Sequence, residues 1–127
     1  MDWHSLSHHG KDPKRIEELK LIELQEMILL TSLLEKLKQT PEHDGTLLDQ
    51  TMVLFGSNLG NASSHDSKNL PVLLAGGGFR HGQHLRFNPD HNTPLCNLFV
   101  SMLQQLGVET DAFASGRQTL NGLSARA

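Results

Sequence analysis

The chain has 127 residues, the size of one small domain or of a piece of a larger one. Eleven Lys and Arg against fourteen Asp and Glu give a net charge of -3, which disfavours a nucleic-acid-binding protein because no broad basic face is available. The longest apolar runs, such as Met27–Leu30, are far shorter than the ~20 residues that span a bilayer. The single cysteine cannot close an internal disulfide, so composition leaves the cellular compartment open.

The first segment, residues 1–12, is polar and rich in histidine, and without a helical or strand period it is predicted to be a loop. Its histidines, His4, His8 and His9, stand out because the whole chain has eight. Three imidazoles that lie so close together in the chain can share a metal ion or a phosphate-like anion. The alternative is a solvated polar loop, since the spacing matches no fixed ligand motif such as H-E-x-x-H.

A long helix is predicted over residues 13–39. Asp12 is placed as its N-cap, Pro13 as its first residue, and Thr40-Pro41 as its stop. One broad apolar face is expected to pack on a core, and it consists of Ile16, Leu19, Ile22, Met27, Leu29, Leu30, Leu33, Leu34 and Leu37. A second stripe, Leu21, Leu24 and Ile28, lies on a different side and needs another cover.

The core is predicted over residues 51–107, as a strand, a loop, a second strand and a helix in that order. The short apolar runs Met52–Gly56 and Val72–Ala75 are interpreted as neighbouring parallel strands, buried on both faces. The polar loop 57–69 leaves the end of the first strand, where α/β sheets bind ligands. In it His65 is a candidate metal ligand and Asp66 a second ligand or a support for another imidazole, although such a pair is often only a hydrogen-bonded turn.

The remaining elements have weaker patterns. Gly76–Gly78 is interpreted as a turn, residues 81–87 as a short edge strand, and Thr93–Leu106 as an amphipathic helix that Gly107 ends. The tail, 108–127, is expected to wrap over the surface. Residues assigned no chemistry are His43, His81, His84 and His91, expected at the surface, and Cys96, expected to be a small buried hydrophobe.

Several motifs carry a resemblance to a known family. They are His4-Ser-Leu-Ser-His8-His9, Leu54-Phe-Gly-Ser-Asn-Leu-Gly60, His65-Asp66, Asn69-Leu-Pro-Val-Leu-Leu-Ala-Gly-Gly-Gly78, Gly82-Gln-His-Leu-Arg86 and Thr93-Pro-Leu-Cys-Asn-Leu98. With these, nearly the whole chain resembles the HxxSHH family, bacterial exported proteins of unknown function that are abundant in planctomycetes. The resemblance implies that the chain is the C-terminal part of a longer parent, whose missing N-terminal part carries the export signal and is a partner for this piece. The parent would be exported or periplasmic.

The family is in turn similar to the alkaline phosphatase and sulfatase superfamily. This implies a partial α/β domain with a parallel sheet, flanking helices and one or two divalent metals, such as zinc, calcium or manganese, that polarise an ester. On this resemblance His65 is a metal ligand, His4, His8 and His9 are further ligands or substrate contacts, and Asn58 stands where relatives have an acidic ligand. The superfamily's nucleophile has no counterpart in this chain.

Three hypotheses follow. The leading one is the C-terminal portion of a metal-dependent hydrolase-like domain, and the second is a non-catalytic exported binding or scaffold module, which the neutral amide of Asn58 favours. The third is a self-sufficient α/β domain with a histidine-rich loop. In an incomplete domain we expect the stripe Leu21, Leu24 and Ile28 to be exposed or covered by another copy.

Overall fold

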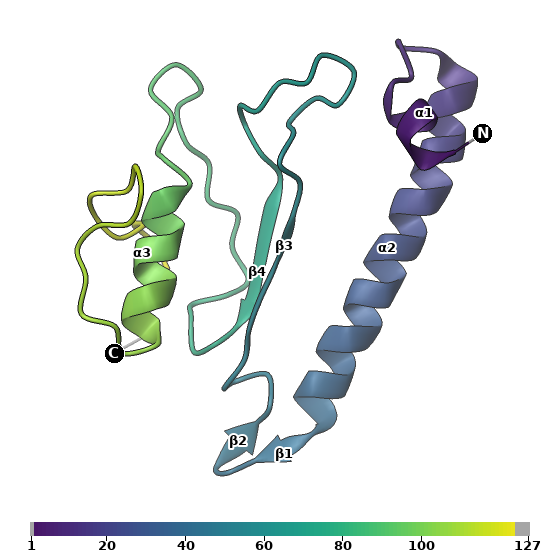
Figure 1. Ribbon diagram of the computed structural model, residues 1–127. Coiled ribbons are helices and arrows are strands. Elements are labelled where there is room, and N and C mark those ends of the chain that lie inside the picture. Colours follow the sequence, from purple (N-terminus) through teal and green to yellow (C-terminus); the bar gives the residue numbers. More distant parts are fainter. Residues whose placement is uncertain (1, 124–127) are drawn as a thin grey trace.

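The computed structural model describes residues 2–123 as helices around two small antiparallel sheets (Figure 1). In chain order the helices and strands are α1 (Trp3–Ser7), α2 (Pro13–Gln39), β1 (Pro41–Glu42), β2 (Gly45–Thr46), β3 (Met52–Gly56), β4 (Val72–Gly76) and α3 (Cys96–Gln105). The β3–β4 sheet stands between α2 on one side and α3 on the other (Figure 1). No helix within residues 2–123 has the length and apolar character needed to cross a membrane.

The N-terminal segment begins with a helix, so the prediction of a loop over residues 1–12 was wrong for its first half. Asp2 is the N-cap of α1, and its carboxylate accepts a hydrogen bond of 2.9 Å from the backbone N–H of Ser5. Leu6 is buried, because α1 packs against the first turns of α2 (Figure 1). One turn of helix is too short to show a period, so only this packing reveals it.

Helix α2 has the predicted ends. The Asp12 carboxylate accepts from the backbone N–H of Lys14 at 2.9 Å, Pro13 is the first helical residue, and Thr40 caps the last turn. The predicted packing was wrong in part: no residue of α2 is buried, and Leu29 and Leu33 are exposed. Helix α2 therefore covers the sheet only partly.

Strands β3 and β4 are neighbours, as predicted, but they are antiparallel, so the predicted parallel pairing was wrong. Leu54 lies opposite Leu74 in the register. The physical reason is the connection, which turns back on itself: Ser57 donates its backbone N–H to Pro71, and Gly60 donates to Asp66 at 2.7 Å. A parallel pair needs a crossover, usually a helix, and the small polar residues of this loop form none.

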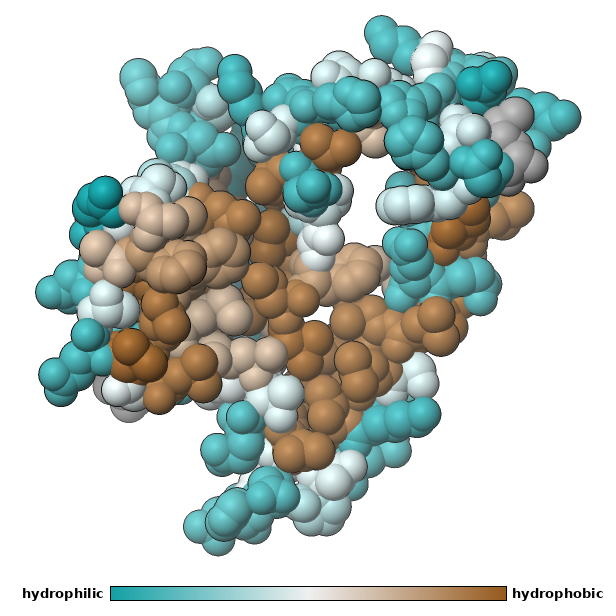
Figure 2. Space-filling view, in the orientation of Figure 1, coloured by the Kyte–Doolittle hydropathy of each residue, from teal (hydrophilic) through white to brown (hydrophobic). Residues whose placement is uncertain are grey.

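The core lies between α3 and the sheet. Phe79, Leu98 and Leu123 form its buried centre, and the side chains packed around them include Met52, Val72, Leu74 and Met102. The core is small, and Leu54 and Leu73 on the sheet stay exposed. Figure 2 shows the resulting surface, in which hydrophobic residues gather across the middle of the molecule from α3 to α2.

The segment after α3 follows the helix surface closely. The backbone N–H of Arg117 donates to the Asn97 side chain at 3.2 Å, and that of Leu120 donates to the Ser101 hydroxyl at 2.8 Å. This agrees with a tail that wraps over the surface, but the burial of Leu123 in the core was missed. Residues 124–127 of the predicted tail lie outside the described residues.

Two further boundaries differ from the sequence prediction. No strand forms over residues 81–87, so the predicted edge strand was wrong. Helix α3 begins at Cys96 rather than Thr93, after a tighter turn in which Asn97 and Leu98 bond back to Pro94 and Leu95. The expected turn is formed by Gly77 and Gly78, because β4 extends to Gly76; all three glycines have positive φ angles. Gly107, at φ +80°, follows the end of α3.

The turn that links β2 to β3 offers a test of its electrostatics. The Asp49 carboxylate accepts hydrogen bonds from the hydroxyl and the backbone N–H of Thr46, both at 2.7 Å, and they lower the pKa of Asp49 below its ordinary 3.8. The fold thus favours the ionised carboxylate. Its contribution to the free energy of unfolding is complete above the unfolded-state pKa and is lost as pH falls through the lower folded-state pKa.

We expect Asp49→Asn to lower the melting temperature at neutral pH, with the difference from the parent shrinking as pH falls below 3.8. Thermal melts followed by circular dichroism at a series of pH values measure it. Asp90→Asn, at another exposed turn, is the control. A difference between parent and Asp49→Asn that is the same at every pH would contradict this role.

Candidate metal centre

Three of the predicted histidines lie together at one end of the molecule. The ring centres of His4 and His8 are 4.8 Å apart, and those of His8 and His65 are also 4.8 Å apart, both pairs meeting edge to face. His8 is half-buried, whereas His4 and His65 are exposed. The structure thus brings His65 into contact with the N-terminal histidine His8. We call these three residues the histidine cluster.

Helix α1 and the loop after β3 build the histidine cluster. His4 and His8 are four residues apart, so the helical turn places their rings on one face, and His8 is the residue that ends α1. The φ angle of His65 is +52°, in the left-handed region that few side chains adopt. The loop and α1 thus meet at His8, the middle ring.

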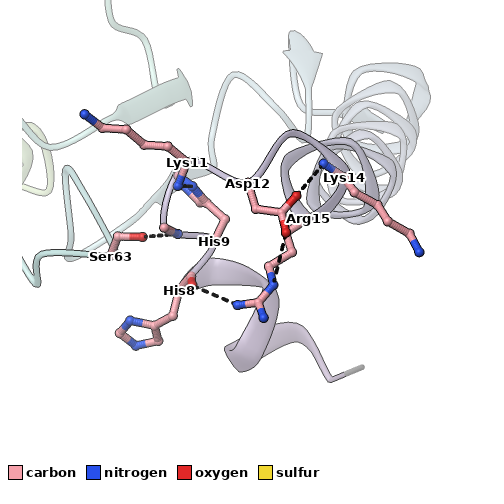
Figure 3. A network of polar contacts seen from close by, with 8 residues as sticks. His8, His9, Lys11, Asp12, Lys14, Arg15 and Ser63 are labelled. Atoms are coloured by element: carbon pink, nitrogen blue, oxygen red, sulfur yellow. Dashed lines mark hydrogen bonds and ion pairs between the residues drawn. The ribbon is translucent and has the colours of Figure 1, made fainter.

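A serine that the sequence analysis did not single out joins these two segments. The Ser63 hydroxyl accepts from the backbone N–H of Gly10 and donates to the carbonyl of Ser7, both at 3.4 Å. Figure 3 shows Ser63 beside the turn that follows His9. No spacing in the sequence could have indicated this contact, because it links residues more than fifty positions apart.

His9 has a different environment from the cluster. Its Nδ1 accepts a hydrogen bond of 3.0 Å from the backbone N–H of Lys11, while the His8 ring projects away from that turn (Figure 3). The Arg15 guanidinium donates to the His8 carbonyl at 3.5 Å, which ties the cluster to the first turn of α2. His9 therefore supports the turn between α1 and α2.

The two other candidates, Asp66 and Asn58, lie in the same loop. The Asp66 carboxylate accepts from the backbone N–H of Lys68 at 3.0 Å, and the Asp66 backbone pairs with Asn61 in a short bridge. Asp66 thus forms the hydrogen-bonded turn that was the alternative to a metal site. Asn58 is exposed near the start of the loop. Nothing in these contacts places either residue in the histidine cluster.

The spacing of the rings can be compared with a zinc site. An imidazole bound at ~2.0–2.1 Å has its ring centre about 3.2 Å from the metal, so two ligands of a tetrahedral site have ring centres about 5 Å apart. The observed 4.8 Å is close to this separation. Within residues 2–123, however, no three His, Cys, Asp or Glu side chains are already arranged to hold a metal ion. The edge-to-face rings must rotate to bind one.

Cys96 and the other histidines lie elsewhere. Cys96 is half-buried at the start of α3, and hydrogen bonds from the Ser115 hydroxyl and backbone lower the pKa of its thiol. His81 bonds the Gly76 carbonyl at 2.9 Å, and His43 contacts Glu42 at 3.0 Å. No family model, curated protein or solved structure matches this chain.

Proposed function

We propose that this chain binds a zinc ion through His4, His8 and His65. The observation that supports the proposal is the contact between rings from two segments far apart in the sequence, at a separation that suits a shared metal. The left-handed backbone of His65 adds to it, since such conformations cost free energy and are frequent at functional sites. His4 and His65 are exposed, so their side chains have room to change rotamer when an ion binds beside His8.

The ligand set favours zinc over calcium or manganese. Imidazole nitrogens suit zinc, whereas calcium and manganese prefer carboxylate and carbonyl oxygens. The two oxygen-bearing candidates, Asp66 and Asn58, have no contact that places them at the cluster. Three protein ligands leave a fourth position for water or a substrate, and a zinc ion there would polarise a phosphate or sulfate ester.

The wider function that we propose is that of the C-terminal portion of a metal-dependent, hydrolase-like domain in an exported protein. It rests on the similarity of the HxxSHH family to the alkaline phosphatase and sulfatase superfamily. In that setting the β3–β4 pair belongs to the antiparallel edge of a larger, mostly parallel sheet, a common arrangement in α/β folds. The exposed Leu54 and Leu73 support this placement, because they need a cover that residues 2–123 do not provide. The parent's missing N-terminal part would supply that cover.

A non-catalytic binding module is the second candidate, and a specific observation favours it. Asp66, the carboxylate next to His65 in the sequence, accepts from the Lys68 backbone, so the proposed ligands are all imidazoles. A site of this kind can hold a metal without a general base beside it. Ester hydrolysis by the zinc-loaded protein separates the two functions.

Zinc titration by calorimetry tests the site. We expect one zinc per chain, and affinity at least about tenfold lower in His65→Ala, because one of three ligands is removed. His91→Ala, an exposed histidine outside the cluster, should bind zinc like the parent. Calcium should not bind with comparable affinity.

The proposal fails if His65→Ala binds zinc as tightly as the parent, or if His91→Ala loses as much affinity. Circular dichroism of each variant shows whether the fold is intact. The exposed position of His65 makes unfolding by this substitution unexpected.

A further inference from the structure

We propose that two copies of this chain associate through the outer face of α2, with the two helices antiparallel. The apolar centre of this face is Leu21, Leu24 and Ile28, whose exposed fractions are 66%, 55% and 50%. We call these three residues the outer stripe. The proposal rests on α2 alone and does not depend on the histidine cluster.

The outer stripe lies opposite the side of α2 that faces the sheet. At 100° per residue its members cluster around one direction, about half a turn away from Leu19, Leu30 and Leu37, which are half-buried. A shallow groove runs along the exposed side, lined by Leu24, Met27, Ile28, Thr31, Ser32 and Glu35. The 27 residues of α2 make a helix about 40 Å long at 1.5 Å per residue. This length allows side chains of two paired helices to meet at several successive turns.

Charged side chains about two helical turns beyond each end of the outer stripe favour a second copy that runs antiparallel. In an antiparallel pair centred near Leu24, Leu21 of one copy lies opposite Ile28 of the other. The same register sets Lys14 of each copy opposite Glu35 of the other, which gives two symmetric ion pairs. In this register a second copy of this chain is therefore complementary to the face in apolar pattern and in charge.

The competing arrangements bring like charges together. A parallel pair sets Glu35 against Glu35 of the second copy, and an antiparallel pair centred on Glu26 sets Glu17 against Glu35. In the favoured register Glu17 lies opposite Ser32 and keeps its 2.6 Å ion pair with Lys20 of its own helix. The apolar area is small, so we expect a dissociation constant on the order of 10 µM.

The test is sedimentation velocity over a range of concentrations, combined with reversal of the charge pair. Leu24→Glu should abolish the dimer, and Glu35→Lys should raise the dissociation constant about tenfold, because attraction becomes repulsion at both ends. Lys14→Glu should do the same. The double variant with both charge reversals should restore the parent's affinity, an effect that only this register explains.

Leu29→Glu is the matched control, since Leu29 is equally exposed on the same helix but lies about 100° from Ile28. It should leave the dimer intact. A parent that stays monomeric up to about 1 mM overturns the proposal, because interfaces weaker than this are not specific. A dimer that Glu35→Lys weakens but the double variant does not restore overturns the antiparallel register. All substituted side chains are exposed, so melting curves should stay near that of the parent.

Discussion

Gly76→Ala is expected to destabilise the fold by at least about 3 kcal/mol, because two costs add at this position. The φ angle of Gly76 is +73°, a conformation that costs a residue with a side chain about 1–2 kcal/mol. In addition, a Cβ atom would overlap the main-chain carbonyl oxygens of Thr51 and Leu48. The Leu48 carbonyl also accepts the backbone N–H of Gly77 at 3.0 Å, so relief of the overlap disturbs the end of the sheet.

Gly82→Ala separates these two costs. Gly82 has nearly the same φ angle, +75°, but nothing lies within 4 Å of the position of its Cβ. We therefore expect Gly82→Ala to cost only about 1 kcal/mol, the conformational part alone. Urea unfolding of both variants measures the difference in the free energy of unfolding. Equal decreases in the two variants would show that the close approach at Gly76 does not affect stability.

Leu98→Ala is expected to destabilise the protein by about 3 kcal/mol and to lower the melting temperature by about 10 °C. Leu98 is only 4% exposed and forms the buried centre of the core with Phe79 and Leu123. Its removal loses the transfer free energy of three carbon atoms and leaves a cavity that the neighbouring backbone cannot fill. A small core has few other contacts to offset this loss.

Leu106→Ala provides the matched comparison. Leu106 caps the same helix, α3, but its exposed fraction is 67%, so its truncation should change stability by less than about 0.5 kcal/mol. Chemical unfolding of the two variants gives both values. A loss below about 1 kcal/mol for Leu98→Ala would mean that the core between α3 and the sheet contributes little to stability.

Local signals in the sequence were enough to define several elements. The ends of α2 depend on Asp12, Pro13 and Thr40, whose effects reach only one helical turn, so they can be read without knowing the fold. The strand Met52–Gly56 was also predicted with the bounds it has, because a short apolar run between turn residues has few alternatives. Gly107 was correctly placed after α3 for the same local reason.

The histidine cluster was accessible to sequence reasoning only in part. The crowding of His4, His8 and His9 in one short segment indicated a candidate site, and the position of His65 after a strand indicated a ligand-binding loop. That His65 meets His8 rather than His9 depends on how the loop folds onto the turn at Gly10, through Ser63. This contact joins distant segments and leaves no periodic signal.

What the sequence by itself determined is the extent of α2 and of β3 and the presence of a second apolar stripe on α2. The tertiary structure alone decided the direction of β4, the helical form of α1 around Leu6 and the burial of Leu123. The physical reason is the range of the interactions. Caps and periodicity act within a few residues, whereas strand direction and core membership depend on hydrogen bonds and packing between segments far apart in the chain.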